Sequence, residues 1–319
     1  MWKNFADGID LNDFTFGSRE TKKAFVTGGT GFVGSHLARE LLFRGWEVHL
    51  LVRETSAHPE SIGLGKKVST HLYDGTTDCL IRILGRVKPH VAFHLAACSI
   101  ASHTPDDITP LIHSNILLGT QLIEAMVNER VDCLVNAGTY WQHYGNEDYN
   151  PVCLYAATKQ AFEMIIRHAV ETASLKAVTL VLYDIYGPDD KRSKLFSQLA
   201  AAARTQKPLA LSPGGQKIDF VFVKDCVEAF IIASERLMNR SAACNERYRV
   251  SSGRTLTLKE VVSIYEEISG TQIPVIWGGR PYRPREIMSP WDGGASLPGW
   301  EPMVLLEEGL RIMLHGKKH

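Results

Sequence analysis

Short apolar segments alternate with longer amphipathic ones along the first half of the chain. Residues 23–27, 47–52 and 91–97 are compact and β-prone, and the last is almost entirely apolar. Between them, apolar residues recur at i,i+4 spacing, as in 37–42, which is typical of helices that pack on a sheet. Apolar strands of this kind occur in parallel sheets that are covered on both faces. The pattern therefore predicts a doubly wound parallel α/β sheet of the Rossmann type.

The same reasoning predicts the later elements, which continue the alternation of strands and helices. The expected elements are a strand with its turn at 71–75, a helix over about 107–129, a strand at 131–136, a helix opening near 155, and helices over 193–203, 256–269 and 305–314.

These elements suggest how the chain is divided. We expect residues 23–183 to form a dinucleotide-binding domain, to which residues 216–245 return. Residues 184–215 and 246–319 would form a smaller C-terminal substrate-binding lobe over the sheet edge where ligands bind in such folds. Residues 1–22 carry mixed charge and several aromatic residues, and we interpret them as an N-terminal extension.

The joint between the first strand and the first helix is rich in glycine, with the sequence TGGTGFVG at 27–34. Such a joint presents unpaired N–H groups and the positive end of the helix dipole, which suits a dinucleotide pyrophosphate. A side chain at Gly28 or Gly31 would block the turn or the phosphate, and one at Gly34 would hold the helix off the sheet. A flexible loop is the alternative, but the position between strand and helix disfavours it. Thr30, Phe32 and Val33 complete the expected phosphate contacts.

Arg53 follows the second strand at the point where the adenosine ribose of a bound dinucleotide is expected. An acidic residue there would accept hydrogen bonds from both ribose hydroxyls, whereas an arginine can pair with a 2′-phosphate through two parallel hydrogen bonds. Arg53 therefore favours NADP(H) over NAD(H). The alternative is an ordinary surface arginine beside Glu54.

Two further strand ends carry candidate cofactor contacts. Asp74, after the third strand, is a candidate for the adenine amino group, and it is equally suited to a turn. The fourth strand ends in Leu95, Ala96 and Ala97, which should run past the nicotinamide ribose and the phosphates.

Tyr155 and Lys159 are four residues apart, so they share one face of the helix that opens there. A lysine ammonium beside a phenol should lower the pKa of the phenol toward the range that suits proton transfer to or from a carbinol oxygen. Thr139, after the preceding strand, supplies a hydroxyl for the same oxygen. A chance pair of exposed residues is the alternative, but the dinucleotide turn upstream disfavours it.

Composition narrows the classes of function. The 35 Lys and Arg balance the 35 Asp and Glu, which gives no support for nucleic acid or an anionic membrane as the main partner. No apolar run approaches the ~20 residues of a membrane span. The six cysteines are scattered without a CxxC pair, so we expect reduced thiols in a cytoplasmic enzyme. No metal site is expected, since a strand separates His90 from His94.

The chain resembles the extended short-chain dehydrogenase/reductase family, within it the nucleotide-sugar epimerases, dehydratases and 4-ketoreductases, from about Lys23 to Met313. The resemblance is carried by TGGTGFVG at 27–34, HLAA at 94–97, NILLGT at 115–120, YAATK at 155–159, YGP at 186–188, DFVFVKD at 219–225, Arg283-Pro284, and GWEP at 299–302. It implies catalytic roles for Thr139, Tyr155 and Lys159, with Lys159 also bonding the nicotinamide ribose. Asn115 would be a weaker, partly structural member. A homodimer formed through two helices per subunit is also implied.

One departure from the family pattern bears on the reaction. Dehydratases of this group place Asp-Glu directly after the hydroxyl residue, whereas Tyr140 and Trp141 follow Thr139 here. Neither side chain can act as that acid/base pair at neutral pH, so dehydration is not expected. The aromatic segment that follows makes Trp141 and His143 candidate substrate contacts. It leaves open whether Thr139 or a neighbour holds the substrate oxygen.

Basic residues after the YGP motif suit a sugar-nucleotide diphosphate, which needs paired cationic donors. Lys194, Arg280, Arg283 and Arg285 are the candidates, with solvated surface cations as the alternative for each. Arg283 is favoured because the resemblance also puts a phosphate ligand there. Asp184 stands where Asn is common in the family, which points to altered substrate contacts.

We therefore expect an NADPH-dependent reduction of the C4 keto group of a nucleoside-diphosphate deoxysugar. Arg53 favours reduction over epimerisation, because an epimerase retains its cofactor through each cycle and often uses NAD. A nucleotide-sugar 4-epimerase is the alternative within the class. A non-catalytic NADP(H)-binding sensor or scaffold protein is the alternative outside it.

Overall fold

A parallel sheet forms the centre of the molecule. The computed structural model describes residues 21–57 and 59–316, and within them eight strands pair in the order β13-β10-β6-β5-β4-β1-β2-β3. Every neighbouring pair in this sheet is parallel. In chain order the strands are β1 (Lys23–Thr27), β2 (Glu47–Val52), β3 (Ser69–Leu72), β4 (Val91–His94), β5 (Cys133–Thr139), β6 (Lys176–Leu182), β10 (Cys244–Val250) and β13 (Ala295–Ser296). The predicted doubly wound Rossmann sheet is confirmed.

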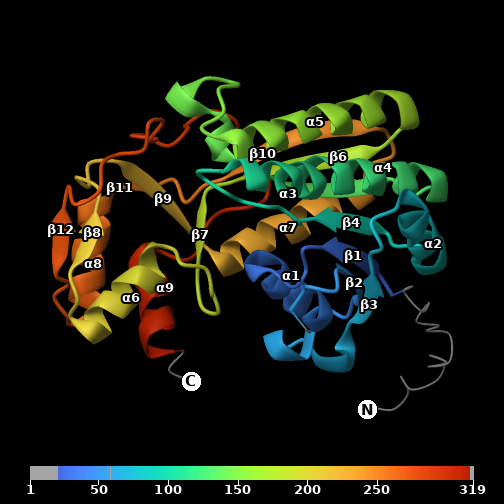
Figure 1. Cartoon of the computed structure of the whole chain (residues 1–319). Helices are drawn as coiled ribbons and strands as arrows, with labels where there is room; N and C mark the ends of the chain where they lie inside the picture. Colours follow the sequence, from blue (N-terminus) through green and yellow to red (C-terminus); the bar gives the residue numbers. More distant parts are fainter. Residues whose placement is uncertain (1–20, 58, 317–319) are drawn as a thin grey trace, which may run out of the picture.

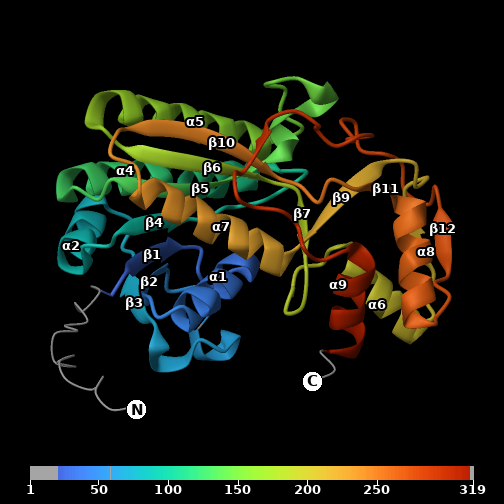
Figure 2. The same ribbon diagram turned by 180° about the vertical axis from the view of Figure 1, so that it is seen from behind.

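Helices cover both faces of this sheet, as Figures 1 and 2 show from opposite sides. One face packs against α1 and α7, whose apolar residues share a core with the strands. The other face packs against α2, α4 and α5 through a second core. The helices are α1 (Phe32–Phe43), α2 (Thr77–Val87), α3 (Ile108–Ile112), α4 (Leu118–Glu129), α5 (Leu154–Ala173), α6 (Leu195–Thr205), α7 (Val223–Met238), α8 (Leu258–Ser269) and α9 (Leu306–His315).

The strand order changes direction between β1 and β4, which lie side by side in the middle of the sheet. All four residues of β4 are buried, as an apolar strand covered on both faces requires. The predicted strand over 91–97 ends early, because the chain leaves the ladder after His94. In open α/β sheets a ligand crevice forms at such a reversal, outside the carboxyl ends of the strands.

A third core holds the C-terminal lobe together, at one end of the molecule in Figure 1. It contains aromatic residues from several segments, among them Phe196 and Tyr265. Besides α6, α8 and α9, the lobe contains two small sheets. These consist of β7 (Asp184–Tyr186), β9 (Lys217–Phe222) and β11 (Thr255–Thr257), and of β8 (Leu209–Leu211) and β12 (Val275–Trp277).

The expected return of residues 216–245 to the main sheet takes a different form. The helix α7 packs on the sheet, but β9 pairs with β7 and β11 instead. The return then continues through β10 to Val250, and β13 adds a short edge strand. The predicted N-terminal extension, residues 1–22, lies outside the described residues except for its last two.

Candidate active site

The glycine turn joins β1 to α1 at the carboxyl edge of the sheet. Gly28 has a φ of +71°, and an added Cβ would lie 2.6 Å from the Ala96 backbone nitrogen, so the turn and the segment after β4 meet backbone to backbone. An added Cβ at Gly34 would lie 2.1 Å from the Gly28 carbonyl oxygen, so this glycine lets α1 begin against the turn. The helix starts at Phe32 without a side-chain cap, which leaves its first N–H groups free for an anion. The turn therefore has the form that accepts a dinucleotide pyrophosphate.

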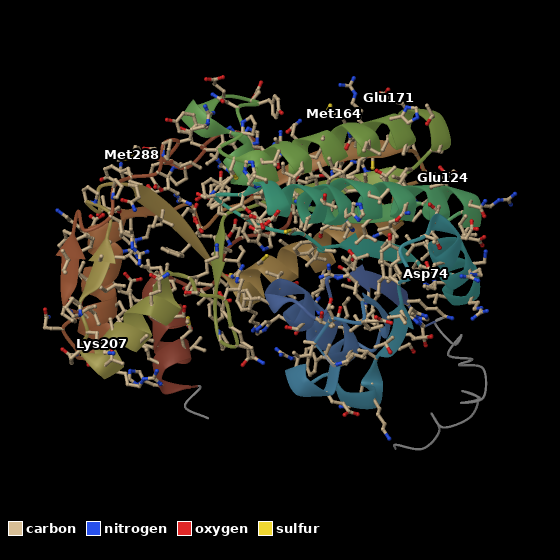
Figure 3. All side chains as sticks on the ribbon, viewed as in Figure 1. Asp74, Glu124, Met164, Glu171, Lys207 and Met288 are labelled. Carbon is tan, nitrogen blue, oxygen red and sulfur yellow. The ribbon has the colours of Figure 1, made fainter. Side chains whose placement is uncertain are left out.

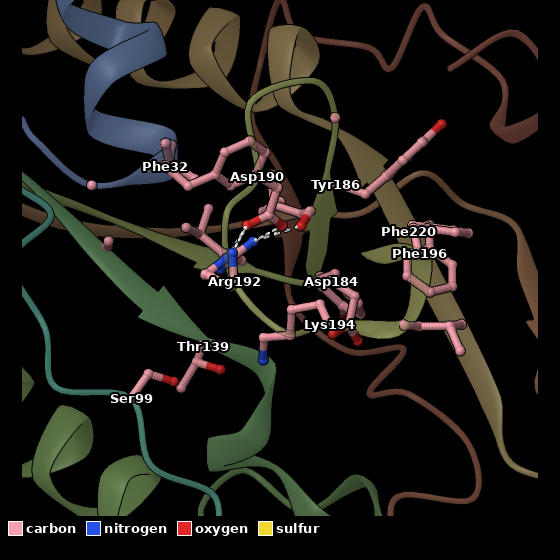
Figure 4. Close-up of a pocket in the computed structure, with 18 of the residues that line it drawn as sticks. Phe32, Ser99, Thr139, Asp184, Tyr186, Asp190, Arg192, Lys194, Phe196 and Phe220 are labelled. Carbon is pink, nitrogen blue, oxygen red and sulfur yellow. Dashed lines mark hydrogen bonds and ion pairs between the residues drawn. The ribbon is translucent and has the colours of Figure 1, made fainter. Parts of the chain in front are cut away.

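A cavity of about 520 Å³ opens beside the turn, between the main sheet and the C-terminal lobe (Figure 4). Most of the predicted site residues line it. They are Gly28, Gly31, Phe32, Val33, Gly34, Leu95, Ala97, Thr139, Trp141, Tyr155, Lys159 and Lys194. Thr30 lines a second cavity of about 580 Å³ beside Arg39 of α1, and Ala96 lies behind Gly28.

Thr139, Tyr155 and Lys159 converge at one end of the cavity beside the glycine turn, hereafter the main cavity. Thr139 is the last residue of β5, and its hydroxyl accepts a 3.3 Å hydrogen bond from the Trp141 N–H. Tyr155 and Lys159 lie one turn apart in α5, and the Tyr155 ring meets Trp141 edge-on with centroids 6.4 Å apart. Hydroxyls from Thr139 and from Ser99 interact with the phenol, and Figure 4 shows both at this end of the cavity. The structure thus brings together the phenol, hydroxyl and ammonium.

The prediction that Lys159 lowers the pKa of Tyr155 is wrong. Burial raises the pKa of Tyr155 to about 12, although hydrogen bonds from Ser99 and Thr139 oppose the rise. Burial also lowers the pKa of Lys159 to about 8. The spacing of the two residues indicates only that they are neighbours, whereas desolvation of both groups decides the sign.

The Lys159 ammonium is only 1% exposed and has no hydrogen-bond partner among the described residues. A buried donor without a partner is costly, so its presence beside a cavity indicates a place for a polar ligand group. The glycine turn and Lys159 lie in the same cavity wall. Together they fit the phosphates and a ribose of a nicotinamide dinucleotide.

Asn115 holds backbone rather than facing the cavity. It is fully buried in the π-helical turn His113–Leu117 between α3 and α4. Its side chain accepts from the Cys98 N–H at 2.7 Å and donates to the Cys98 carbonyl at 3.0 Å and to Thr158 at 2.9 Å. Asn115 therefore ties the segment after β4 to α5, which agrees with the structural part of the role that the resemblance implied.

The two predicted adenosine contacts lie outside both cavity linings. Arg53 is exposed just after β2, and its side chain makes no hydrogen bond or ion pair with the described residues. Burial raises the pKa of Cys98, and the positive charge of Arg53 opposes this rise. The Arg53 guanidinium therefore lies near the segment after β4, which contains Cys98. Asp74 is a turn residue that accepts from the Thr76 N–H at 2.9 Å, and Figure 3 shows it at the outer end of the sheet.

The predicted substrate cations lie in two places. Lys194 is exposed at the start of α6 and extends into the main cavity (Figure 4). Arg283 lines a neighbouring cavity of about 100 Å³, where Glu286 accepts its hydrogen bonds at 2.8 and 3.0 Å. The Arg283 guanidinium also lies 5.2 Å from the Trp141 ring centre. Because Trp141 and Asp184 line both cavities, Arg283 stands one side chain away from the main cavity.

The prediction that His143 contacts substrate is corrected by the structure. His143 is 2% exposed and lies outside the main cavity lining. Its ring stacks on Trp291 with centroids 3.9 Å apart, and its two nitrogens contact the Glu147 carbonyl and Arg247. Both nitrogens are therefore used inside the protein, and burial lowers the pKa of His143 to about 4.

Several cavity residues were not predicted from the sequence. Arg192 lies 4.7 Å from the Phe32 ring and donates to Asp190 at 2.7 Å (Figure 4). Tyr140 donates a 2.7 Å hydrogen bond to Asp184, whose pKa is raised by burial. Of these residues, Ser99 is the one that the sequence could have indicated, because it lies two residues beyond the HLAA motif.

The described residues contain no group of three or more histidine, cysteine or acidic side chains placed to hold a metal ion. Within the same residues, no helix combines the length and apolarity needed to cross a membrane. All six cysteines are free, and three of them are buried.

A family model described as the NAD dependent epimerase/dehydratase family matches residues 24–250. A CDP-abequose synthase from Yersinia pseudotuberculosis is 26% identical over 83% of this chain and 90% of its own length. A dTDP-6-deoxy-L-talose 4-dehydrogenase (NAD(P)(+)) from Kitasatospora kifunensis is 28% identical over 90% of this chain and 92% of its own.

Among solved structures, the UDP-glucose 4-epimerase of Thermus thermophilus in complex with NAD superposes with a TM-score of 0.78. It is 27% identical and covers 92% of this chain and 98% of its own. The likeness includes both the sheet and the C-terminal lobe.

Proposed function

Because the chain belongs to the NAD-dependent epimerase/dehydratase family, we propose that it reduces the C4 keto group of a nucleoside-diphosphate deoxysugar with NADPH. The observation that carries the proposal is that Thr139, Tyr155 and Lys159 line the same cavity as the glycine turn. Burial raises the pKa of Tyr155 to about 12, so the phenol can donate a proton to a carbonyl oxygen at neutral pH, as a reduction requires. The choice of reduction over epimerisation rests on Arg53, because a net reductase draws on NADPH.

Two parts of the cavity lining and one exposed arginine outside it would divide the binding of the cofactor among them. The turn at 27–34 would take the pyrophosphate, Lys159 the nicotinamide ribose and Arg53 the 2′-phosphate. Bound NADPH would supply the hydride. The Arg53 side chain has no partner among the described residues, so pairing with a 2′-phosphate requires no exchange of partners.

The chain itself supplies the proton and the oxygen contacts. Tyr155 would donate its proton to the C4 oxygen as negative charge develops there, and the hydroxyls of Thr139 and Ser99 would hold that oxygen. Trp141, edge-on to Tyr155, would form an apolar wall beside the sugar. Lys194 and Arg283 would attract the diphosphate.

The relatives support this choice of substrate. One of them is named as a 4-dehydrogenase of a dTDP-deoxysugar that works with NAD(P)+. Reduction of a C4 ketone is that reaction written in reverse, so the same groups would serve both directions. Another is named for the synthesis of a CDP-linked sugar.

A nucleotide-sugar 4-epimerase is the second candidate, favoured by the likeness to a UDP-glucose 4-epimerase that holds NAD. It would first oxidise C4 and then return the hydride, so its cofactor would not be consumed. A non-catalytic NADP(H)-binding role is disfavoured because Thr139, Tyr155 and Lys159 are all present and converge on the cavity.

The test is incubation of the purified protein with NADPH and a panel of CDP-, dTDP- and UDP-linked 4-keto sugars. We expect stoichiometric loss of NADPH absorbance with at least one of them. Conversion of a sugar nucleotide without loss of NADPH would reject the reductase in favour of the epimerase. Absence of any turnover would favour the non-catalytic role.

A homodimer is part of the proposal. Exposed apolar side chains, including Ile108, Val127 and Met164, lie on α3, α4 and α5, and Figure 3 shows Met164 on the outer side of α5. Light scattering of the eluting protein should give twice the monomer mass. A monomer mass at micromolar concentration would contradict this part.

A further inference from the structure

A buried carboxylate lies one helical turn beyond Lys159. Glu163 of α5 is only 8% exposed, and its neighbours come from two other parts of the fold. Gln142, after β5, donates a 2.8 Å hydrogen bond to it. Arg247 of β10 lies 3.5 Å from its other oxygen. A buried charge is expensive unless it is paired and hydrogen-bonded, and Glu163 is both.

The contact with Gln142 leads to the catalytic hydroxyl. Gln142 is fully buried, and its side-chain oxygen accepts a 3.1 Å hydrogen bond from the Thr139 N–H. Its amide group donates to Gln160 at 2.7 Å as well as to Glu163. Two residues of α5 therefore fix the amide of Gln142, and Gln142 in turn fixes the backbone at Thr139.

The sheet leaves room for this carboxylate. A Cβ added at Gly138 would lie 3.3 Å from a Glu163 oxygen and 2.9 Å from a Thr179 methyl carbon. The absence of a side chain at Gly138 lets Glu163 approach β5 immediately before Thr139. Glu163 therefore packs closely between α5 and β5, the strand that ends at Thr139.

Glu163 also acts on Lys159 by charge. Burial lowers the pKa of Lys159, and the Glu163 carboxylate opposes that fall. The other ionisable groups around the ammonium are Tyr155, one turn earlier, and His94 of β4, which burial keeps neutral with a pKa of about 3. Arg247 stands behind Glu163, and Arg192 acts on Tyr155 across the cavity. Among these groups, Glu163 is the one carboxylic acid, and its charge acts to raise the pKa of Lys159.

We propose that Glu163 is a positioning residue for both catalytic groups: its charge sustains the Lys159 ammonium, and its hydrogen bond to Gln142 fixes Thr139. Because Arg247 pairs with Glu163, it weakens the electrostatic effect of the carboxylate on Lys159. The proposal deepens the proposed function and rests on it for the roles of Thr139 and Lys159. The link between Glu163 and Lys159 is measurable without turnover.

The direct test is the titration of Lys159 in protein labelled with ¹³C at the lysine ε-carbons, followed by NMR. The Lys159 signal is assigned by its loss in Lys159→Arg. We expect a midpoint near pH 8. Glu163→Gln keeps an acceptor for Gln142 but removes the charge, and it should lower the midpoint by about 1 pH unit. Arg247→Gln leaves the carboxylate unneutralised and should raise the midpoint.

Shifts of opposite sign separate a charge effect from general damage to the fold. The matched control is Glu171→Gln, at the position labelled on the same helix in Figure 3. Its exposed carboxylate pairs with Arg167, and the midpoint of this variant should equal that of the wild type. Equal midpoints for wild type, Glu163→Gln and Arg247→Gln would overturn the electrostatic half of the proposal.

The geometric half is tested by kinetics on the reductase. Glu163→Leu removes the acceptor as well as the charge, so its kcat should fall about tenfold below that of Glu163→Gln, with NADPH affinity matched between the two variants. Equal kcat values would overturn this half. If no 4-keto sugar is turned over but the midpoints shift as expected, the proposed function fails and the link from Glu163 to Lys159 stands.

Discussion

The two walls of the cavity differ in how their polar groups are held. At the catalytic end, Lys159 is buried without a partner among the described residues. The Thr139 N–H donates to the buried side chain of Gln142, which in turn donates to two residues of α5. On the lobe side, two arginines already have partners: Arg192 is paired with Asp190, and Arg283, in the neighbouring cavity, is paired with Glu286. Both arginines are partly exposed.

This difference has a physical consequence. Groups fixed on a sheet and a long helix are preorganised, so they need no rearrangement when charge develops on a substrate. Cations that are paired with carboxylates must exchange those partners for a diphosphate, which reduces what each contributes to binding. We therefore expect changes at the catalytic end to affect the rate most, and changes on the lobe side to affect substrate affinity modestly.

Tyr155→Phe should have the largest effect. It removes the proton donor while the ring and its contact with Trp141 remain, so kcat should fall about 10²- to 10⁴-fold with NADPH affinity unchanged. Steady-state kinetics and a fluorescence titration with NADPH provide the two numbers. A variant with near-normal kcat would show that another group supplies the proton.

Arg53→Ala tests the cofactor part of the comparison, since this cation has no partner to exchange among the described residues. Loss of a pair of charge-assisted hydrogen bonds to a 2′-phosphate should weaken NADPH about 10- to 100-fold and leave NADH unchanged. Arg82→Ala, an exposed arginine beside Asp74, is the control. Equal losses for NADPH and NADH would show that Arg53 is not the phosphate ligand.

The free energy of unfolding should depend on pH because His94 is buried near the catalytic end of the cavity. Burial lowers the pKa of His94 to about 3, below the 6.5 of an unfolded chain, so the folded protein binds fewer protons than the unfolded one. This contribution is complete above pH 6.5 and is lost as the pH falls. Between pH 6.5 and 5 the loss is about 2 kcal/mol.

Urea unfolding at the two pH values measures that loss. His94→Gln removes the titrating group, so it should show a smaller difference between pH 6.5 and 5 than the wild type, by about 2 kcal/mol. The other histidines with lowered pKa values titrate in both proteins and cancel. An identical pH dependence would mean that His94 is not held neutral by burial.

Lys194→Ala should have the smallest effect. The ammonium is exposed at the cavity edge, so its removal should raise the KM for the sugar nucleotide a few-fold without changing kcat. A fall in kcat would instead place Lys194 at the reacting atoms. It would contradict the expectation that changes on the lobe side affect substrate affinity and not the rate.

The same division explains what could be predicted from the sequence. The glycine turn and the pair Tyr155 and Lys159 are local patterns, so spacing alone identified them. The lobe wall brings Lys194, Phe220 and Leu310 together from distant segments, and only the folded chain shows that they meet.

Burial was the other quantity that spacing could not supply. The sequence suggested a lowered pKa for Tyr155, but desolvation reverses the sign. His143 was expected at the substrate because it follows Thr139 closely. Its ring instead stacks on Trp291, from a distant part of the chain, which no local pattern indicates.

The most direct test of the proposed reduction uses NADPH that carries deuterium at the transferable position, with a 4-keto sugar nucleotide that the enzyme accepts. We expect one deuterium per product molecule, bonded to sugar C4 and located by NMR, with one NADPH oxidised for each. A sugar nucleotide product without deuterium at C4, formed while the NADPH remains intact, would contradict the account.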